Sequence, residues 1–331
     1  MRDDNNPRTS SDIEAVKISP RVRYRSTQLD FFVRLLTQPK AVVGLVILFI
    51  FVFMAIFAPY IAPGDPSRYV SRQNQPPSKE YWLGTTGQGQ DVFHQIVWGA
   101  RVSLGIGFTV GFLTTLIGLI IGMTAGYLHG LADGILNMFT NVFLIIPGLP
   151  LLITLASFLP PGTLTVILVL TFTGWAWGAR VFRSQTLSLR EKDFVSACVV
   201  SGEGSPYIIF LEILPNMLSL VVSSFFGATA YTIGADAGLA FLGFENVNIV
   251  SWGTMLFWAS NNSALLMGTW WTFVPPGLCI ALVSFATTML IYAMDEVTNP
   301  RLKSEKEIIR VLKNFHVASK RSTPVVRKPA S

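Results

Sequence analysis

The residues best placed to act together lie between Asp193 and Asn216, a charged stretch set between two long apolar segments. Residues 195–200 favour a short helix, Gly202 permits the left-handed backbone at which helices often end, and Pro206 can begin the next helix. A short rigid helix that projects from a membrane can pass the movement of a partner protein to the helices beside it. The pattern fits equally well a loop that packs on the protein's own membrane face.

Motifs for covalent chemistry are absent from the sequence. It contains no Gly-Lys dipeptide, which excludes a phosphate-binding P-loop, and neither Gly-x-Ser-x-Gly nor His-Glu-x-x-His occurs. His94, His129 and His316 do not have the spacing of metal ligands. Cys198 and Cys279 fall in different predicted compartments, so we expect no disulfide between them. We therefore expect no catalytic residue, metal site or cofactor on this chain.

The composition is that of a membrane protein. Apolar residues make up 51% of the chain and charged residues 13%, and the apolar residues form long uncharged runs. We predict an all-α polytopic membrane protein with six transmembrane helices. The spans are expected near residues 41–61, 102–128, 135–158, 162–179, 213–235 and 273–294, the third and fourth being separated by Pro160-Pro161-Gly162. Residues 246–272 are uncharged but rich in Asn, Ser, Thr and Trp, which favours a re-entrant or interfacial loop.

The basic residues predict the orientation. Eight Lys and Arg residues precede the first span, four lie between Arg180 and Lys192, and nine follow the sixth span, whereas residues 240–272 contain none. By the positive-inside rule, both termini are cytoplasmic, and the loops 62–101 and 240–272 are external. Within the cytoplasmic tail 1–40, apolar spacing predicts an interfacial helix near 28–38, or an ordinary juxtamembrane helix. Residues 296–331 form the second cytoplasmic tail. The net charge of +6 is attributed to topology and to contact with anionic lipid, in preference to nucleic acid.

Charged residues avoid the middle of every predicted span, which argues against an ion-coupled carrier. Asp236, at the external end of the fifth span, is the nearest exception. A carboxylate that reaches the interface or caps a broken helix explains Asp236 better than an ion site does.

A series of motifs occurs in a fixed order along residues 83–301. It comprises Leu83-Gly84-Thr85, Gly89-Gln90-Asp91-Val92, Gly99-Ala100-Arg101-Val102-Ser103-Leu104, Gly238-Leu239-Ala240-Phe241-Leu242-Gly243, Ser251-Trp252-Gly253, Pro276-Gly277-Leu278 and Asn299-Pro300-Arg301. With these motifs the chain resembles binding-protein-dependent ABC importer permeases, specifically the C-type subunit of the dipeptide/oligopeptide subfamily. The stretch from Asp193 to Asn216 is similar to the "EAA" loop of that family, which docks onto an ATPase.

The resemblance implies a type-I ABC importer permease fold, with the permease core at 102–295 and the ATPase-coupling loop at 190–216. It assigns coupling to Asp193, Ser196, Ala197, Cys198, Gly202, Ile213, Leu214 and Pro215. Docking of an external solute-binding protein is assigned to Asp91, Arg101, Trp252 and Gly253. Ser196 stands where the family has glutamate, Cys198 where it has alanine and Gln90 where it has arginine, so the coupling contact is expected to be weaker or differently built.

The implied function is uptake of peptides through the plasma membrane. The implied partners are a second permease, two cytoplasmic ATPases that bind ATP and Mg²⁺, and the external binding protein, which is expected to meet residues 62–81 and 252–271. An interfacial aromatic belt is the alternative for those loops. Related importers carry oligosaccharides or nickel, so the substrate stays open, as do a stand-alone ion-coupled or passive carrier and a membrane scaffold without transport.

Overall fold

The structure is a computed structural model that describes residues 38–128 and 130–298. Over these residues the chain is helical, and one bridge between Thr85 and Asp91 is its only strand-like pairing. The helices in chain order are α2 (Pro39–Ile56), α3 (Ala58–Ile61), α4 (Val92–Tyr127), α5 (Leu131–Ile145), α6 (Gly148–Phe158), α7 (Thr163–Arg190), α8 (Asp193–Val200), α9 (Ser205–Tyr207), a π-helix (Ile208–Ile213), α10 (Leu214–Asn216), α11 (Leu218–Phe241), α12 (Trp252–Asn261), α13 (Ala264–Met267), a 3₁₀ turn (Trp270–Thr272) and α14 (Val274–Thr298). The predicted helix near 28–38, apart from Gln38, and the tail beyond residue 298 lie outside the described residues.

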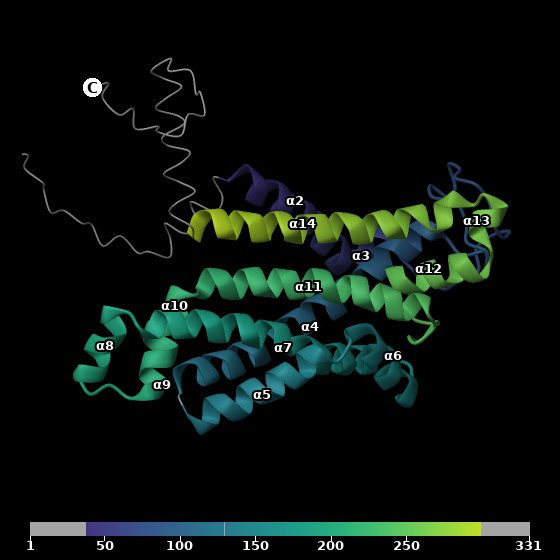
Figure 1. Ribbon diagram of the computed structural model, residues 1–331. Coiled ribbons are helices and arrows are strands. Elements are labelled where there is room, and N and C mark those ends of the chain that lie inside the picture. Colours follow the sequence, from purple (N-terminus) through teal and green to yellow (C-terminus); the bar gives the residue numbers. More distant parts are fainter. Residues whose placement is uncertain (1–37, 129, 299–331) are drawn as a thin grey trace, which may run out of the picture.

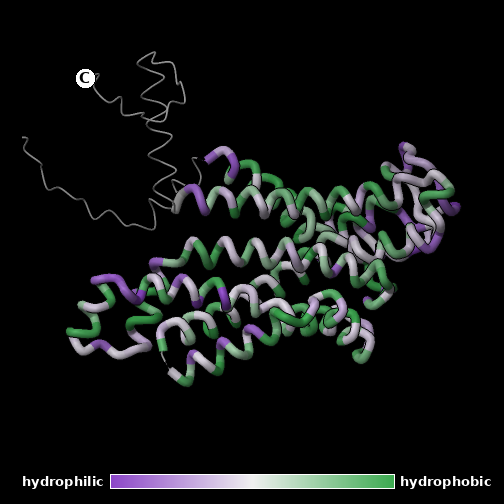
Figure 2. The backbone as a smooth tube through the Cα atoms, viewed as in Figure 1, coloured by the Kyte–Doolittle hydropathy of each residue, from purple (hydrophilic) through white to green (hydrophobic). Residues whose placement is uncertain are grey.

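Five helices, α2, α4, α7, α11 and α14, are each long and apolar enough to cross a bilayer, and the bent pair α5 and α6 makes a sixth span when counted as one. Figure 1 shows these helices side by side along one direction. Hydrophobic residues follow their length, and hydrophilic residues gather at the two ends of the bundle (Figure 2). The prediction of an all-α polytopic membrane protein is confirmed, with six spans on this count.

Several helices extend beyond the predicted spans. The second begins at Val92 in place of residue 102, the fourth continues to Arg190 in place of residue 179, and the fifth runs from Leu218 to Phe241. The predicted limits were set by charged residues, but a helix needs no apolar side chains to continue into water. Asp91 fixes the early start of α4, because its carboxylate accepts a hydrogen bond from the backbone N–H of Phe93 at 2.8 Å.

The third predicted span is two helices that meet at an angle of 88°. Pro147 lies at the junction, between Ile145 at the end of α5 and Gly148 at the start of α6. Proline has no backbone N–H to continue the ladder and holds the preceding residue in extended backbone, which Ile146 adopts. The segment therefore turns sharply within the apolar layer.

The tightest packing joins α4 to α7 along Gly118, Gly122 and Gly126, which are spaced four residues apart on one face of α4. A Cβ atom built on Gly122 would lie 2.5 Å from the carbonyl oxygen of Ala179, and one on Gly126 would lie 2.8 Å from that of Arg183. No side chain fits at these positions. Glycine lets the two backbones approach closely, as in many membrane helix pairs.

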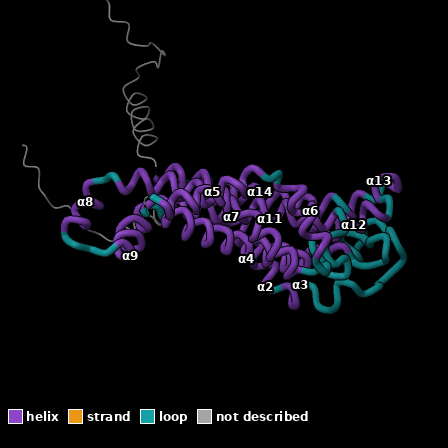
Figure 3. Tube along the Cα trace, turned by 60° about the horizontal axis from the view of Figure 1, so that its bottom comes forward, coloured by secondary structure: helices purple, strands orange, loops and turns teal. Residues whose placement is uncertain are grey.

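Short helices and loops cover the two ends of the bundle, which we name the α8 end and the α12 end. The α8 end holds α8, α9, the π-helix and α10, that is, residues 193–216. The α12 end holds the loop 62–91 with α12 and α13. Figure 3 shows that most of the loop structure gathers at the α12 end, while α8 and α9 project from the other.

Candidate coupling and docking sites

Gly202 ends α8 with a complete capping motif. Its φ is +83°, in the left-handed region that the sequence predicts for this position. The N–H of Gly202 donates to the carbonyl oxygen of Val199 at 3.1 Å, and the N–H of Glu203 donates to that of Cys198 at 3.1 Å. These two bonds form a Schellman motif, which satisfies carbonyls that the helix end would leave unpaired. The motif makes α8 a short element with a fixed end.

One face of α8 is exposed. It is formed by Asp193, Ser196, Ala197 and Val200, at positions i, i+3, i+4 and i+7, and we name it the exposed face of α8. Val200 is 88% exposed and is the most accessible apolar side chain on it. Asp193 lies in the first turn, where a negative charge stabilises a helix. The sequence reasoning missed Val200, although its spacing from Asp193 could have revealed it.

The opposite face of α8 is anchored in the bundle. Val195 is 2% exposed and packs in a cluster with Phe182 of α7 and Ile213 of the π-helix. Cys198 and Leu214 are partly buried against the same cluster. Of the predicted coupling residues, Ile213 is thus a core residue beneath α8, whereas Pro215 is exposed beyond it. The cluster connects the exposed face of α8 to a long helix.

The chain between α8 and α11 is wound more widely than an α-helix over Ile208–Ile213. Pro215 lies two residues beyond the end of this turn, and its lack of an N–H removes a donor from the helical ladder. π-helical turns inside helices are frequent at functional sites. Here the wide turn brings Ile208, Ile209 and Ile213 together on the side that supports Val195.

Two polar contacts tie α5 to α7 near the α8 end. Arg183 donates from Nε and Nη2 to the two carboxylate oxygens of Asp133 at 2.7 and 2.8 Å, and Arg180 donates to Asn141 Oδ1 at 2.8 Å.

Partial burial, together with the carboxylates of Glu212 and Glu203, raises the pKa of the Cys198 thiol, which disfavours a nucleophilic thiolate. In residues 38–128 and 130–298, no three His, Cys, Asp or Glu side chains gather as metal ligands would.

Trp252 and Gly253 fix α12 to the bundle. The Trp252 side chain is fully buried, its Nε1–H donates to the carbonyl oxygen of Ile96 at 3.1 Å, and its backbone N–H donates to Ser103 Oγ at 3.1 Å. A Cβ on Gly253 would lie 2.7 Å from that of Ala240. Both residues are buried within this chain, and the predicted contact with an external protein stays a prediction. Within the chain they position α12.

Asp91 and Arg101 lie on or beside α4. Asp91 caps the helix through one carboxylate oxygen, and its other oxygen, Oδ2, lies 2.8 Å from Nδ1 of His94. Both oxygens are therefore engaged within the chain. Arg101 is exposed and lies over the ring of Trp98 at 6.0 Å. Of the four predicted docking residues, Arg101 is therefore the one whose charge is accessible to a partner.

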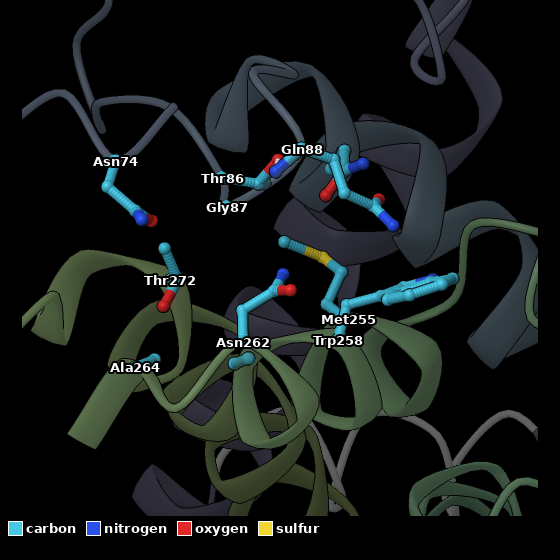
Figure 4. A pocket seen from close by; sticks show the side chains of 11 residues that line it. Asn74, Thr86, Gly87, Gln88, Met255, Trp258, Asn262, Ala264 and Thr272 are labelled. Atoms are coloured by element: carbon cyan, nitrogen blue, oxygen red, sulfur yellow. Dashed lines mark hydrogen bonds between the residues drawn. The ribbon is translucent and has the colours of Figure 1, made fainter. Parts of the chain in front are cut away.

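The loop 62–91 meets α12 and α13 around a small pocket (Figure 4). Asn74 and Gln88 come from the loop, while Trp258 and Asn262 come from the α12 side. The amide of Asn262 fills the space above Gly87, where an added Cβ would lie 2.5 Å from Nδ2. The pocket therefore lies where the loop 62–91 packs against α12 and α13, and it leaves no room for a ligand.

A larger cavity of about 680 Å³, which we name the central cavity, lies between α4, α7, α11 and α14. Its walls carry hydroxyl, aromatic and small side chains, among them Thr115, Trp177, Ser223 and Tyr231. The hydroxyls of Thr115 and Ser223 are buried and have no hydrogen-bond partner within the described part of the chain. Asp295 is the one charged residue of the lining. Such a wall can hydrogen-bond to a polar solute, and its one charge is negative.

Comparison with known proteins shows that the chain is similar to components of membrane transport systems. Residues 118–304 match the family described as "binding-protein-dependent transport system inner membrane component", and residues 27–77 match the "N-terminal TM domain of oligopeptide transport permease C". The oligopeptide transport system permease protein OppC of Bacillus subtilis is 33% identical over 259 residues, which is 77% of this chain and 84% of that protein. The dipeptide transport system permease protein DppC of Escherichia coli is 38% identical over 272 residues, 80% of this chain and 89% of that protein.

Proposed function

The chain belongs to the family of binding-protein-dependent transport system inner membrane components, among the permeases of peptide ABC transporters, and from this we propose that it is one of two permeases in an ATP-driven peptide importer. A second permease, two cytoplasmic ATPases and an external solute-binding protein complete the proposed importer. ATP and Mg²⁺ bind to the ATPases. This chain makes and breaks no covalent bond, and it contributes part of the path and the contact with an ATPase.

The exposed face of α8 is the single observation that carries this proposal. Val200 offers an apolar side chain to a groove on an ATPase, and Asp193 and Ser196 beside it offer polar contacts. Because Val195 of α8 and Phe182 of α7 belong to one packed cluster, a force on α8 would be passed through that cluster to α7. Closure of the ATPase pair would then tilt α7 and its neighbours as rigid bodies.

The proposed orientation places the α8 end in the cytoplasm. The basic residues Arg180, Arg183, Arg190 and Lys192 lie at or near that end, whereas residues 240–272 of the α12 end contain no Lys or Arg. Both termini are then cytoplasmic, and the protein is a multi-pass component of the inner (plasma) membrane.

The central cavity is this chain's proposed share of the translocation path. Trp177 and Tyr231 are exposed although they lie on long membrane helices, so their rings are free to meet a solute or the second permease. The hydroxyls of Thr115 and Ser223 supply donors and acceptors for peptide groups. A wall with little charge suits peptides of varied sequence.

The α12 end is the proposed dock for the external binding protein. α13 presents three exposed apolar side chains, Leu265, Leu266 and Met267, between two residues in left-handed backbone, Ser263 and Gly268. Exposed apolar groups on a rigid turn favour contact with another protein. Leu266→Ser should reduce stimulation of transport by the binding protein without changing recovery of the chain, and unchanged stimulation would exclude this surface.

The test of the coupling proposal compares two identical substitutions. Val200→Glu places a carboxylate on the exposed face of α8, and Val70→Glu places one on an exposed residue at the α12 end. The tagged chain is purified in mild detergent from its native membrane, and co-purifying ATPase is quantified by mass spectrometry. Val200→Glu should lower ATPase recovery by at least about tenfold, because an unpaired carboxylate in an interface costs more than about 1.4 kcal/mol.

Val70→Glu should recover as much ATPase as the unaltered chain, which shows that an added charge alone does not disrupt the complex. Uptake of a labelled peptide, measured in parallel, should fall with ATPase recovery. If Val200→Glu retains both ATPase binding and uptake, α8 is an interfacial loop and the coupling proposal fails.

A further inference from the structure

The central cavity carries its charge at one end. Asp295 is the one charged residue of its lining and belongs to the last turns of α14, on the side of the bundle where α8 lies (Figure 1). Asp295 is exposed, and none of the ion pairs within the described residues includes it. Its carboxylate is therefore available to a solute that occupies the cavity.

The basic side chains of the neighbouring helices are engaged away from this carboxylate. On α7, Arg180 and Arg183 hydrogen-bond to side chains of α5, and Arg190 lies 5.7 Å from the centre of an aromatic ring of α4. On α2, Lys40 pairs with Glu296 at 3.5 Å. None of these four basic residues lines the central cavity. The charge that a solute meets on the wall of the cavity is thus negative.

The rest of the wall offers hydrogen bonds without charge. Thr115 and Ser223 are each 7% exposed, and their hydroxyls have no partner in the described residues. On α11 the lining runs from Leu220 to Thr232, about 18 Å at 1.5 Å per residue. An extended peptide of about five residues has the same length. A short peptide can therefore lie along these hydroxyls with one side chain near the acid.

A carboxylate without a counter-ion attracts a cation and repels an anion. Because Asp295 is exposed, water weakens this attraction, as it does at other accessible ion pairs. The helices around the cavity restrict the water beside a bound solute and so preserve part of the attraction. We expect a preference of about threefold to tenfold for a positive over a neutral side chain.

We propose that Asp295 gives the path a charge preference, so that peptides with a basic side chain pass faster than neutral or acidic peptides of the same length. This inference rests on the proposed function and deepens it, because it names the class of peptide that passes best. The uncharged hydroxyls still admit varied side chains, and the carboxylate ranks those side chains by charge.

The experiment measures initial rates of uptake of three labelled peptides, Ala-Lys-Ala, Ala-Gln-Ala and Ala-Glu-Ala. Right-side-out membrane vesicles contain the complete transporter and ATP, and the binding protein is added outside. Because the same binding protein is present in all samples, its own preference cancels when each variant is compared with the unaltered chain.

Asp295→Asn should lower the ratio of basic to neutral peptide uptake by about threefold to tenfold. Asp295→Glu, the matched control, keeps the charge and should preserve the ratio. Asp295→Lys should lower the ratio further and favour the acidic peptide.

A second measurement reports the charge of the cavity without any uptake. Ser224→Cys places a thiol on the cavity wall. Its rates of reaction with a cationic and an anionic methanethiosulfonate are compared in the purified complex, after subtraction of the labelling of Cys198 and Cys279. Adding Asp295→Asn should lower the ratio of the cationic to the anionic rate by about threefold to tenfold.

Three outcomes overturn the inference. An unchanged peptide ratio in Asp295→Asn shows that the carboxylate does not act on the solute. An unchanged reagent ratio shows that Asp295 does not set the charge of the cavity. If the unaltered chain takes up none of the three peptides, the proposed function fails and this inference fails with it, whereas uptake with an unchanged ratio removes the inference alone.

Discussion

Gly122→Ala should separate α4 from α7, whereas Gly105→Ala on the same helix should not. An added Cβ at Gly122 would lie 2.5 Å from the carbonyl oxygen of Ala179 and 2.8 Å from Cβ of Phe182. At Gly105 nothing lies within 4 Å of the added atom. The two variants thus place the same methyl group on one helix in two opposite surroundings.

The difference in stability between the variants isolates the cost of the overlap. Both substitutions carry the same gain in helix propensity, up to about 1 kcal/mol, which cancels in the comparison. The obstacle at Gly122 is backbone and cannot rotate away, so α7 has to retreat by about 1 Å. Overpacking of this kind costs about 1–3 kcal/mol, and we expect Gly122→Ala to be less stable than Gly105→Ala by that amount.

The assay is equilibrium unfolding in mixed micelles titrated with a denaturing detergent, followed by circular dichroism. Peptide uptake provides a second readout, since Phe182 belongs to both the α4–α7 contact and the cluster under α8. A lower unfolding midpoint for Gly122→Ala together with reduced uptake is the expected result. If the two variants unfold at the same detergent concentration, the close approach of α4 and α7 is not what holds them together.

Three further predictions each concern a single residue. Trp252→Phe removes the hydrogen bond to the Ile96 carbonyl and should lower the free energy of unfolding by about 1–3 kcal/mol, measured in the same assay; an unchanged midpoint would show that this bond contributes nothing. Arg183→Lys cannot keep both hydrogen bonds to Asp133 and should lower the free energy of unfolding by about 1 kcal/mol, a value that already allows for partial exposure of the pair. A Lys variant as stable as the original would mean that the second bond contributes nothing to stability. Because burial raises the pKa of Glu245 to about 7 in the folded chain, the contribution of this carboxyl group to stability is complete below about pH 4.5 and should fall by on the order of a few kcal/mol as the pH rises through about 7. Glu245→Gln should remove this part of the pH dependence, which thermal unfolding at several pH values measures.

The sequence was sufficient for the features that local chemistry determines. Long uncharged runs predict the membrane helices, and the left-handed backbone at Gly202 follows from its place after a short helical segment. The early start of α4 was within reach as well, because Asp91 is a good N-cap, but the apolar run alone does not mark it.

Features that depend on contacts between distant segments were not predictable from the sequence. Trp252 was taken for a surface residue of an external loop, yet Ile96 and Ser103, about 150 residues away, enclose it. Asp236 was predicted to reach the interface or to cap a broken helix, and the burial of Glu245 was not predicted, because no local pattern indicates that either acid will be buried. The bend at Pro147 lay inside a run long enough to suggest an unbroken helix.

That bend also determines where water has to reach in this protein. The last carbonyls of α5 and the first N–H groups of α6 have no partner within their helices, and lipid tails offer none. Each such group left in hydrocarbon costs several kcal/mol. The break therefore has to face water or another protein. A Cβ atom on Gly148 would lie 3.9 Å from the hydroxyl of Tyr231, which lines the central cavity, so the bend lies beside this cavity. Hydration of the cavity and the shape of this broken helix are consequently linked, and drying the cavity would favour straightening or shielding the bend.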